Sequence, residues 1–219
     1  MTKNYPSEEY YKNISYYKDM HKNGYDLING RKRDSKDAYD GKSTVTFAQI
    51  IKEIIKNENI KNMIDYGCGK GKFYNNGFNL GNKLVPPLRK FWNIDIKLYD
   101  PCYEKYSKFE KDQTFDLTIC IDVLEHIPES DIEWILDRFF KISKKFIFIN
   151  VACYEAIALL PNGENAHINI QKPIWWLNRF EKLLKDHKEI KVICVCTIKD
   201  NGKIKHIPLE YGCRIKDYL

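Results

Sequence analysis

The amino-acid sequence predicts an α/β fold, in which helices cover both faces of a mostly parallel sheet and an antiparallel hairpin closes it. From residue 48 onwards, short apolar stretches alternate with segments of helical spacing, which is typical of doubly wound proteins. The stretch Phe146–Val151 is apolar except at Asn150, as expected of a central parallel strand covered on both faces. Near the carboxyl terminus, Asp200-Asn201-Gly202 separates two apolar strands and predicts a hairpin.

The spacing of apolar residues places the individual elements. Paired tyrosines near the amino terminus predict a weakly amphipathic helix over residues 7–21. Ser43 or Thr44 is expected to cap a second helix that ends near residue 57, and Pro128 marks the start of a helix that continues to about residue 140. A further helix is expected over residues 172–187. Strands are expected at residues 61–66, 95–99, 117–121, 146–151, 190–198 and 204–207.

The composition favours one soluble, cytoplasmic protein. A length of 219 residues suits one α/β domain over residues 45–219, with an amino-terminal extension or lid over residues 1–44. The chain starts with polar residues and has no apolar segment like that of a signal peptide. The longest apolar runs are far too short to cross a bilayer, so no membrane insertion is expected.

The charge does not favour a nucleic-acid partner, and the cysteines do not favour a metal site. The net charge of +6 accompanies a general richness in Lys, Asn, Ile and Tyr, so it does not favour nucleic acid as a partner. The seven cysteines are scattered and form no pair of CxxC motifs, so no metal site is expected.

The central motif is a glycine-rich turn that follows the strand ending at Tyr66. Asp65 stands two places before Gly67, and the glycines follow the pattern Gly67-x-Gly69-x-Gly71. A dinucleotide-binding turn has the pattern GxGxxG, so the third glycine here comes one place early. The acidic residue suggests a ligand amine rather than a phosphate.

Polar residues gather at the carboxyl ends of the predicted strands, where ligands of open parallel sheets bind. They include the glycine turn, Asp100 after the second strand, the segment Asp122–His126 after the next strand, and the loop Asn162–His167. This convergence predicts one ligand site at that edge of the sheet.

Two of these segments resemble a known family. Ile64–Gly71 resembles the first motif of class I S-adenosylmethionine-dependent methyltransferases, and Phe115–Pro128 resembles their fourth-strand segment. The latter is most similar to small-molecule methyltransferases of the ubiquinone-biosynthesis type. The resemblance covers roughly residues 48–155. It implies a Rossmann-like, doubly wound sheet of seven strands with a reversed final strand.

The resemblance implies S-adenosyl-L-methionine as the cofactor. Asp65 and the backbone around the glycines would hold its methionine part, Asp100 would bind the ribose hydroxyls, and Asp122 would lie near the methyl group. The implied cofactor-binding residues are Asp65, Tyr66, Gly67, Cys68, Gly69, Gly71, Asp100, Pro101, Asp122, Val123 and Leu124.

The chain departs from the family pattern in two places. The connection from Gly71 to Asp100 is long and irregular, with a helix expected to start near Lys72. The segment from Pro101 to Thr114 is too short for a helix and a strand, so the region of the third strand is expected to be shortened.

His126 and His167 are the candidate catalytic residues, because each follows a strand and histidine suits general-base work near neutral pH. For His126 the alternative is packing or capping at the start of the next helix. His21, Trp175 and Trp176 are candidate contacts of the acceptor. The two tryptophans are adjacent, so one of them is expected in the core.

The leading hypothesis is methyl transfer to a small-molecule acceptor by in-line displacement. A second hypothesis takes RNA or protein as the acceptor, because the amino terminus is basic and rich in tyrosine. A third takes the chain as a non-catalytic module that binds the cofactor.

Overall fold

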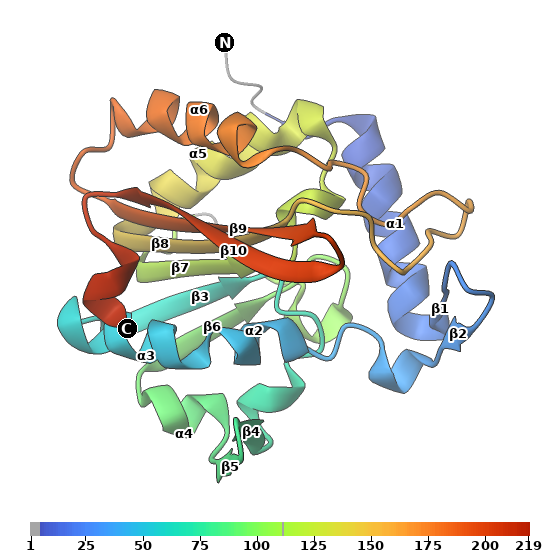
Figure 1. Cartoon of the computed structure of the whole chain (residues 1–219), viewed down its shortest axis with the longest axis horizontal. Helices are drawn as coiled ribbons and strands as arrows, with labels where there is room; N and C mark the ends of the chain where they lie inside the picture. Colours follow the sequence, from blue (N-terminus) through green and yellow to red (C-terminus); the bar gives the residue numbers. More distant parts are fainter. Residues whose placement is uncertain (1–4, 111) are drawn as a thin grey trace.

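A computed structural model describes residues 5–110 and 112–219. Its centre is a six-stranded sheet with the strand order β10-β9-β8-β7-β3-β6 (Figure 1). All neighbouring strands are parallel except β9 and β10, which are antiparallel. The strands are β3 (Asn62–Tyr66), β6 (Asp95–Tyr99), β7 (Phe115–Ile121), β8 (Ser143–Ala152), β9 (Lys191–Asp200) and β10 (Lys203–Tyr211). The mostly parallel α/β fold is therefore confirmed.

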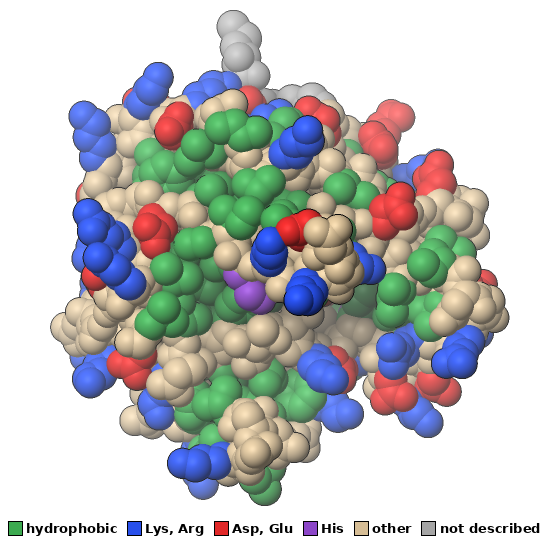
Figure 2. Space-filling model, viewed as in Figure 1, with side chains coloured by type: hydrophobic (Ala, Val, Ile, Leu, Met, Phe, Trp, Pro, Cys, Tyr) green, Lys and Arg blue, Asp and Glu red, His purple; other side chains and the backbone are tan. Residues whose placement is uncertain are grey.

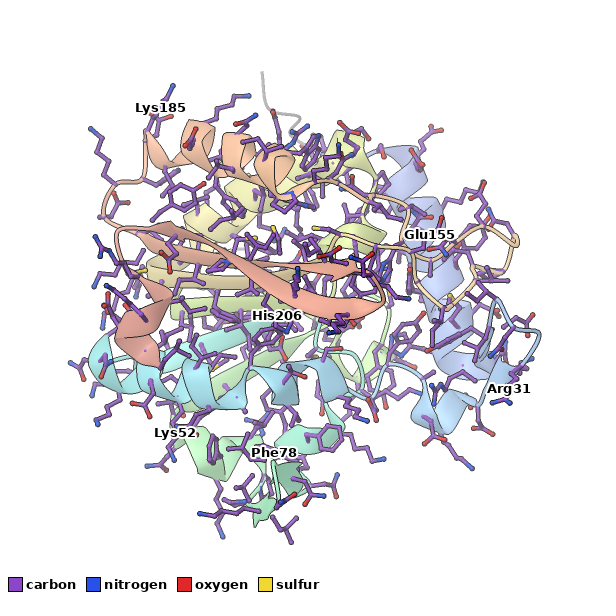
Figure 3. The ribbon with its side chains drawn as sticks, in the orientation of Figure 1. Arg31, Lys52, Phe78, Glu155, Lys185 and His206 are labelled. Carbon is purple, nitrogen blue, oxygen red and sulfur yellow. The ribbon has the colours of Figure 1, made fainter. Side chains whose placement is uncertain are left out.

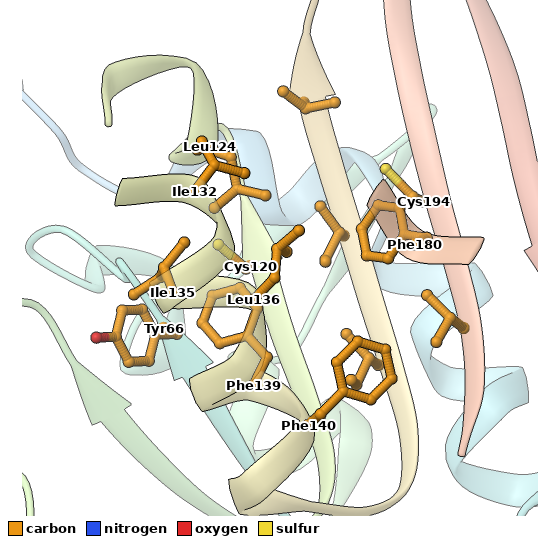
Figure 4. Close-up of a cluster of buried hydrophobic side chains, with 14 of the residues drawn as sticks. Tyr66, Cys120, Leu124, Ile132, Ile135, Leu136, Phe139, Phe140, Phe180 and Cys194 are labelled. Carbon is orange, nitrogen blue, oxygen red and sulfur yellow. The ribbon is translucent and has the colours of Figure 1, made fainter. Parts of the chain in front are cut away.

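Helices cover both faces of the sheet. In Figure 1, α5 (Ile132–Ile142) and α6 (Pro173–Leu184) lie above it, and α3 (Ala48–Asn57) and α4 (Leu88–Trp92) lie below it. The two faces have separate cores: Cys120 of β7 packs with α5 and α6, as Figure 4 shows. The neighbouring Ile119 and Ile121 pack on the opposite face with α3 and α4. This alternation follows from the two-residue period of a strand.

The closing hairpin agrees with its prediction. Lys203 pairs with Asp200, and the two residues between them, Asn201 and Gly202, have φ values of 47° and 77°. Positive φ at both central residues is what a two-residue hairpin turn of the favoured hand requires, and Asn-Gly is the sequence best suited to it.

The sheet has six strands rather than the predicted seven. Among the described residues between Pro101 and Thr114, the only helical or strand element is one 3₁₀ turn, Glu104–Tyr106. The segment is too short to cross the sheet and return as a strand. The shortening expected at the third strand is thus present, and the expected total of seven strands was wrong.

The connection from β3 to β6 is irregular, as predicted. The helix expected near Lys72 lasts for a single 3₁₀ turn, Lys72–Tyr74. It is followed by a small hairpin of β4 (Phe78–Leu80) and β5 (Lys83–Val85), and then by α4.

The helix expected after Ser43 is divided into α2 (Lys42–Thr46) and α3, with the break at Phe47. The hydroxyl of Ser43 does not cap it. It donates instead to Asp122 Oδ2 over 2.8 Å, so the predicted capping role was wrong.

The amino-terminal segment lies across the carboxyl ends of the strands. Helix α1 (Glu8–Asn23) starts at Ser7, whose side chain accepts from the backbone N–H of Tyr10. Ser7 also donates to Asp131 through its backbone N–H and its hydroxyl, over 2.7 and 2.5 Å. A small hairpin of β1 (Tyr25–Asp26) and β2 (Lys32–Arg33) follows (Figure 1). Within the described residues, no helix is long and apolar enough to span a membrane.

Candidate active site

The glycine turn after β3 is held close to two other segments. The backbone N–H groups of Gly67 and Cys68 donate to Tyr99 O at the end of β6, over 2.7 and 3.1 Å. Gly69 has a φ of +57°, and a Cβ atom added there would lie 2.2 Å from Tyr39 O. The glycine is therefore required both by its backbone conformation and by the close approach of the amino-terminal segment.

Asp100 fixes the turn from the end of β6. Its Oδ2 accepts from Gly69 N and its Oδ1 from Cys102 N, both over 2.8 Å. The side chain is only 7% exposed. Burial raises the pKa of Asp100, and these backbone N–H groups act in the opposite direction because they stabilise the carboxylate.

A pocket opens beside this turn, with an open volume of about 910 Å³ including the part that reaches solvent. The sheet side of the pocket includes Gly67, Gly69 and Asp100, and the opposite side comes from the amino-terminal segment. The residues of that segment that line it are Tyr10, Asn13, Ile14, Tyr17, His21, Tyr39, Gly41, Ser43 and Thr44.

Most predicted cofactor residues meet at this pocket. Those that line it are Tyr66, Gly67, Cys68, Gly69, Asp100, Pro101, Asp122 and Val123. Asp65, Gly71 and Leu124 do not line it. The carboxylate of Asp65 is buried behind the wall, where it accepts from the hydroxyl of Tyr74 over 2.6 Å. Thr44, which lines the pocket, acts with Tyr74 to lower the pKa of Asp65, against the larger effect of burial.

The burial of Asp65 has a measurable consequence for stability. Burial raises its pKa to about 7, although the hydroxyl of Tyr74 acts to lower it. The folded state therefore retains a proton that the unfolded state releases near pH 4. Stability contributed by this protonated carboxyl is complete below pH 4 and is lost as the pH rises through 7.

We expect Asp65→Asn to remove this pH dependence in the cofactor-free protein. Relative to the wild type, the variant should gain stability between pH 4 and pH 8, by roughly 3–4 kcal/mol in all. Urea unfolding at several pH values measures the difference. The exposed Asp26→Asn is the control, and parallel pH profiles for all three proteins would contradict the expectation.

His126 lies at the pocket wall and His167 directly behind it, with their ring centroids 4.8 Å apart. Burial, together with the neighbouring His167, lowers the pKa of His126 to about 4. Burial also lowers the pKa of His167. Both rings are therefore neutral at pH 7, and a low pKa makes His126 a weak base in the free protein.

Of the three residues predicted to contact the acceptor, only His21 lies at the pocket. His21 lines the pocket, where its ring stacks against Tyr103 at a centroid distance of 5.4 Å. Trp175 and Trp176 do not line it. Trp176 is fully buried in the core beneath α6, and Trp175 lies under the guanidinium of Arg179, 3.0 Å from its ring centroid. The structure thus brings neither tryptophan to the site.

Sequence reasoning offered the amino-terminal segment as a lid with His21 at the acceptor, but it did not name the tyrosines of the pocket wall, Tyr10, Tyr17 and Tyr39, as site residues, and it did not single out Glu125. The tyrosine pairs in α1 were a signal of the former, since Tyr10 and Tyr17 share one face at helical spacing. Glu125 is fully buried and lies beside Asp122, His126 and His167, with one ligand atom from each within 4.8 Å of the others.

Comparison with known proteins adds one finding. A family model described as a methyltransferase domain matches residues 39–186, which is more than half of the chain. No curated protein and no solved structure matches the chain. The match includes the glycine turn, Asp100 and the segment after β7. The chain therefore belongs to the methyltransferase-domain family and is a class I S-adenosylmethionine-dependent methyltransferase.

Proposed function

We propose that the chain binds S-adenosylmethionine in the pocket at the carboxyl ends of the strands and transfers its methyl group to a small-molecule acceptor. The observation that carries this proposal is the enclosure of the pocket. Tyr10, Tyr17 and Tyr39 line it opposite the glycine turn, so the space beside the cofactor is bounded on two sides. A space that is bounded on two sides and partly lined by aromatic rings suits a small acceptor better than a polymer chain.

The residues present fit the cofactor. Asp100 offers a buried carboxylate for the ribose hydroxyls, and each of its oxygens retains a lone pair after its backbone hydrogen bond. Asn13 Nδ2 and His21 Nδ1 are buried without a hydrogen-bond partner in the described part of the chain, and both residues line the pocket. Such unpaired polar atoms are costly unless a ligand completes them.

In this assignment the backbone at Gly67 and Gly69 holds the methionine part, and Asp122 and Val123 lie near the methyl group. Asp65 does not line the pocket, so it supports the wall from behind, where it accepts from the hydroxyl of Tyr74, rather than by direct contact with the cofactor. The cofactor, when bound, supplies an electrophilic methyl carbon. The chain's own contribution is to align the acceptor and to exclude water, which the aromatic residues of the amino-terminal segment do as a lid.

The similarity of the segment after β7 to small-molecule methyltransferases of the ubiquinone-biosynthesis type supports the same class of acceptor. RNA or protein as acceptor is less well supported. On the face drawn in Figure 2, Lys and Arg are spread among acidic side chains instead of forming one patch. Arg31, from the basic cluster of the amino-terminal segment, lies at the outer edge of the molecule in Figure 3, away from the sheet.

Calorimetry with S-adenosylmethionine and with its demethylated product tests the proposal. We expect each to bind the full-length chain with a stoichiometry of one. We also expect Tyr17→Phe to bind them with nearly wild-type affinity, because it retains the ring at the pocket wall and removes only a hydroxyl whose contacts, to Ala166 O over 3.0 Å and to His126 Nδ1 over 2.6 Å, lie within the protein. A folded sample that binds neither compound would contradict the proposal.

The same titration separates the acceptor classes. An added short RNA or basic peptide should not change the affinity for the cofactor product. A salt-sensitive increase in affinity on adding RNA would favour the second class of acceptor. Binding of the cofactor with no methyl transfer to any acceptor class would favour a non-catalytic binding module.

A further inference from the structure

Four side chains converge at the wall of the pocket beside the proposed methyl group. Asp122, Glu125 and His126 follow β7 directly, and His167 comes from the loop after β8. One ligand atom from each lies within 4.8 Å of the others. Asp122 and His126 line the pocket, whereas Glu125 is fully buried and His167 is 8% exposed behind them.

The hydrogen bonds of both histidines leave the same ring atom available. Nδ1 of His126 contacts Ala166 O over 2.8 Å, and Nδ1 of His167 contacts Tyr154 O over 2.5 Å. His126 Nδ1 also lies 2.6 Å from the Tyr17 hydroxyl, which donates its own proton to Ala166 O over 3.0 Å. A carbonyl oxygen only accepts, so with this arrangement each Nδ1 carries the proton and donates it. Each Nε2 therefore keeps its lone pair. A histidine held through Nδ1–H by a carbonyl is the arrangement typical of metal ligands.

The two carboxylates lack a compensating charge. Glu125 Oε1 accepts from Ala152 N over 2.8 Å, but the buried Oε2 has no partner among the described residues. Asp122 Oδ2 accepts from Ser43, and a carboxylate oxygen of Asp122 lies within 4.8 Å of one of Glu125. Two acidic groups so close, one of them without solvent contact, require a proton or a cation between them.

The backbone of Asp122 supports a specialised role. Its φ is 61°, in the left-handed region that a non-glycine residue seldom adopts. Such a conformation persists only where the surroundings fix it, and it is common at ligand sites. Here it directs the chain from β7 into the 3₁₀ turn Leu124–His126, which carries two of the four side chains.

We propose that Asp122, Glu125, His126 and His167 bind one divalent cation of the first transition row at the wall of the pocket. Two imidazoles with two carboxylates suit Mn²⁺, Fe²⁺, Co²⁺ or Zn²⁺ better than Ca²⁺, which takes oxygen ligands only. Because Asp122 and His126 line the pocket, we expect the coordination positions that these four side chains do not fill to face it. In the proposed methyl transfer, those positions bind an oxygen of the acceptor. This part of the inference rests on the proposed function.

The sequence-based expectation of no metal site depended on cysteine pairs. The spacing found here is different: three ligands lie within the segment Asp122–His126 directly after β7, and the fourth follows only after the next strand. That fourth position depends on where the loop after β8 folds back, which no local pattern specifies.

Manganese binding to the full-length, chelator-stripped protein tests the site. The signal of free Mn²⁺ in electron paramagnetic resonance decreases as the ion binds. We expect one Mn²⁺ per chain, with bound water detected by proton relaxation. We expect His167→Gln and Asp122→Asn each to weaken binding by at least ~10-fold.

The matched controls are His187→Gln and Asp186→Asn, which should bind as the wild type does. They follow α6 and precede the amino end of β9, whereas the proposed ligands follow the carboxyl ends of β7 and β8. In Figure 3, Lys185, which precedes the two control residues in the chain, lies far from Glu155, which follows β8. Failure of the folded wild type to bind either Mn²⁺ or Zn²⁺ stoichiometrically would overturn the proposal, as would equal affinities in variants and controls. If His167→Gln loses its circular dichroism signal, Asp122→Asn decides, because its side chain is exposed.

Calorimetry with the cofactor on the metal-free protein keeps the two proposals distinct. Cofactor binding without any metal binding would leave the proposed function standing and remove the metal site. Metal binding without cofactor binding would do the reverse. A bound Mn²⁺ without exchangeable water would contradict the open coordination positions.

Discussion

Gly69→Ala is expected to lower the free energy of unfolding by about 3–5 kcal/mol and to weaken cofactor binding by at least ~10-fold. The added Cβ would lie 2.2 Å from Tyr39 O, so the backbone of the amino-terminal segment has to move. That movement breaks the hydrogen bond from Lys70 N to Tyr39 O, which is 2.7 Å long. The left-handed conformation adds about 1–2 kcal/mol for any L side chain.

Gly81→Ala is the matched control, because it separates the conformational cost from the clash. Gly81 has a φ of +58°, almost equal to that of Gly69, but a Cβ atom there would have no neighbour within 4 Å. We expect it to lose only about 1–2 kcal/mol and to bind the cofactor normally. Urea denaturation and calorimetry measure both quantities. Equal losses in the two variants would show that the contact between the turn and Tyr39 is unimportant.

The elements that the sequence predicts well are those specified by local patterns. Strand β6 was predicted at its exact bounds, because an alternating apolar stretch ends at Asp100-Pro101, where proline stops the strand. The hairpin of β9 and β10 follows from Asn201-Gly202. The division between α2 and α3 at Phe47 was missed, because nothing in the sequence signals that Ser43 contacts Asp122 rather than the helix.

A lid over residues 1–44 with His21 at the acceptor was among the predictions, but the contacts that hold α1 over the pocket could not be predicted, because they join segments far apart in the chain. Tyr17 and His126 illustrate this: the Tyr17 hydroxyl lies 2.6 Å from His126 Nδ1, and the two residues are 109 positions apart. The adjacent Trp175 and Trp176 mark a buried helix face, but a pattern on one helix does not say which surface covers it. Here the tryptophans pack into the core between α6 and the sheet face opposite to α3, and not against the pocket.

Asp100→Asn is expected to weaken binding of the cofactor by about 100-fold and to destabilise the fold by about 1–3 kcal/mol. Both carboxylate oxygens already accept from backbone N–H groups, those of Gly69 and Cys102. An amide has one oxygen, so its NH₂ group must face one of these donors. The turn around Gly69 would then be displaced, and the acceptor for a ribose hydroxyl would be lost as well.

The effect depends on geometry as well as on charge, and the choice of controls separates the two. Asp95→Asn removes the same charge from the exposed start of β6 and should change neither property. Asp100→Glu retains the charge but moves the oxygens outward, so it should also lose both backbone hydrogen bonds and bind poorly. If Asp100→Glu bound the cofactor as well as the wild type while Asp100→Asn did not, charge alone would explain the role of this residue. Poor binding by both variants, with normal binding by Asp95→Asn, is the result that the two hydrogen bonds at 2.8 Å lead us to expect.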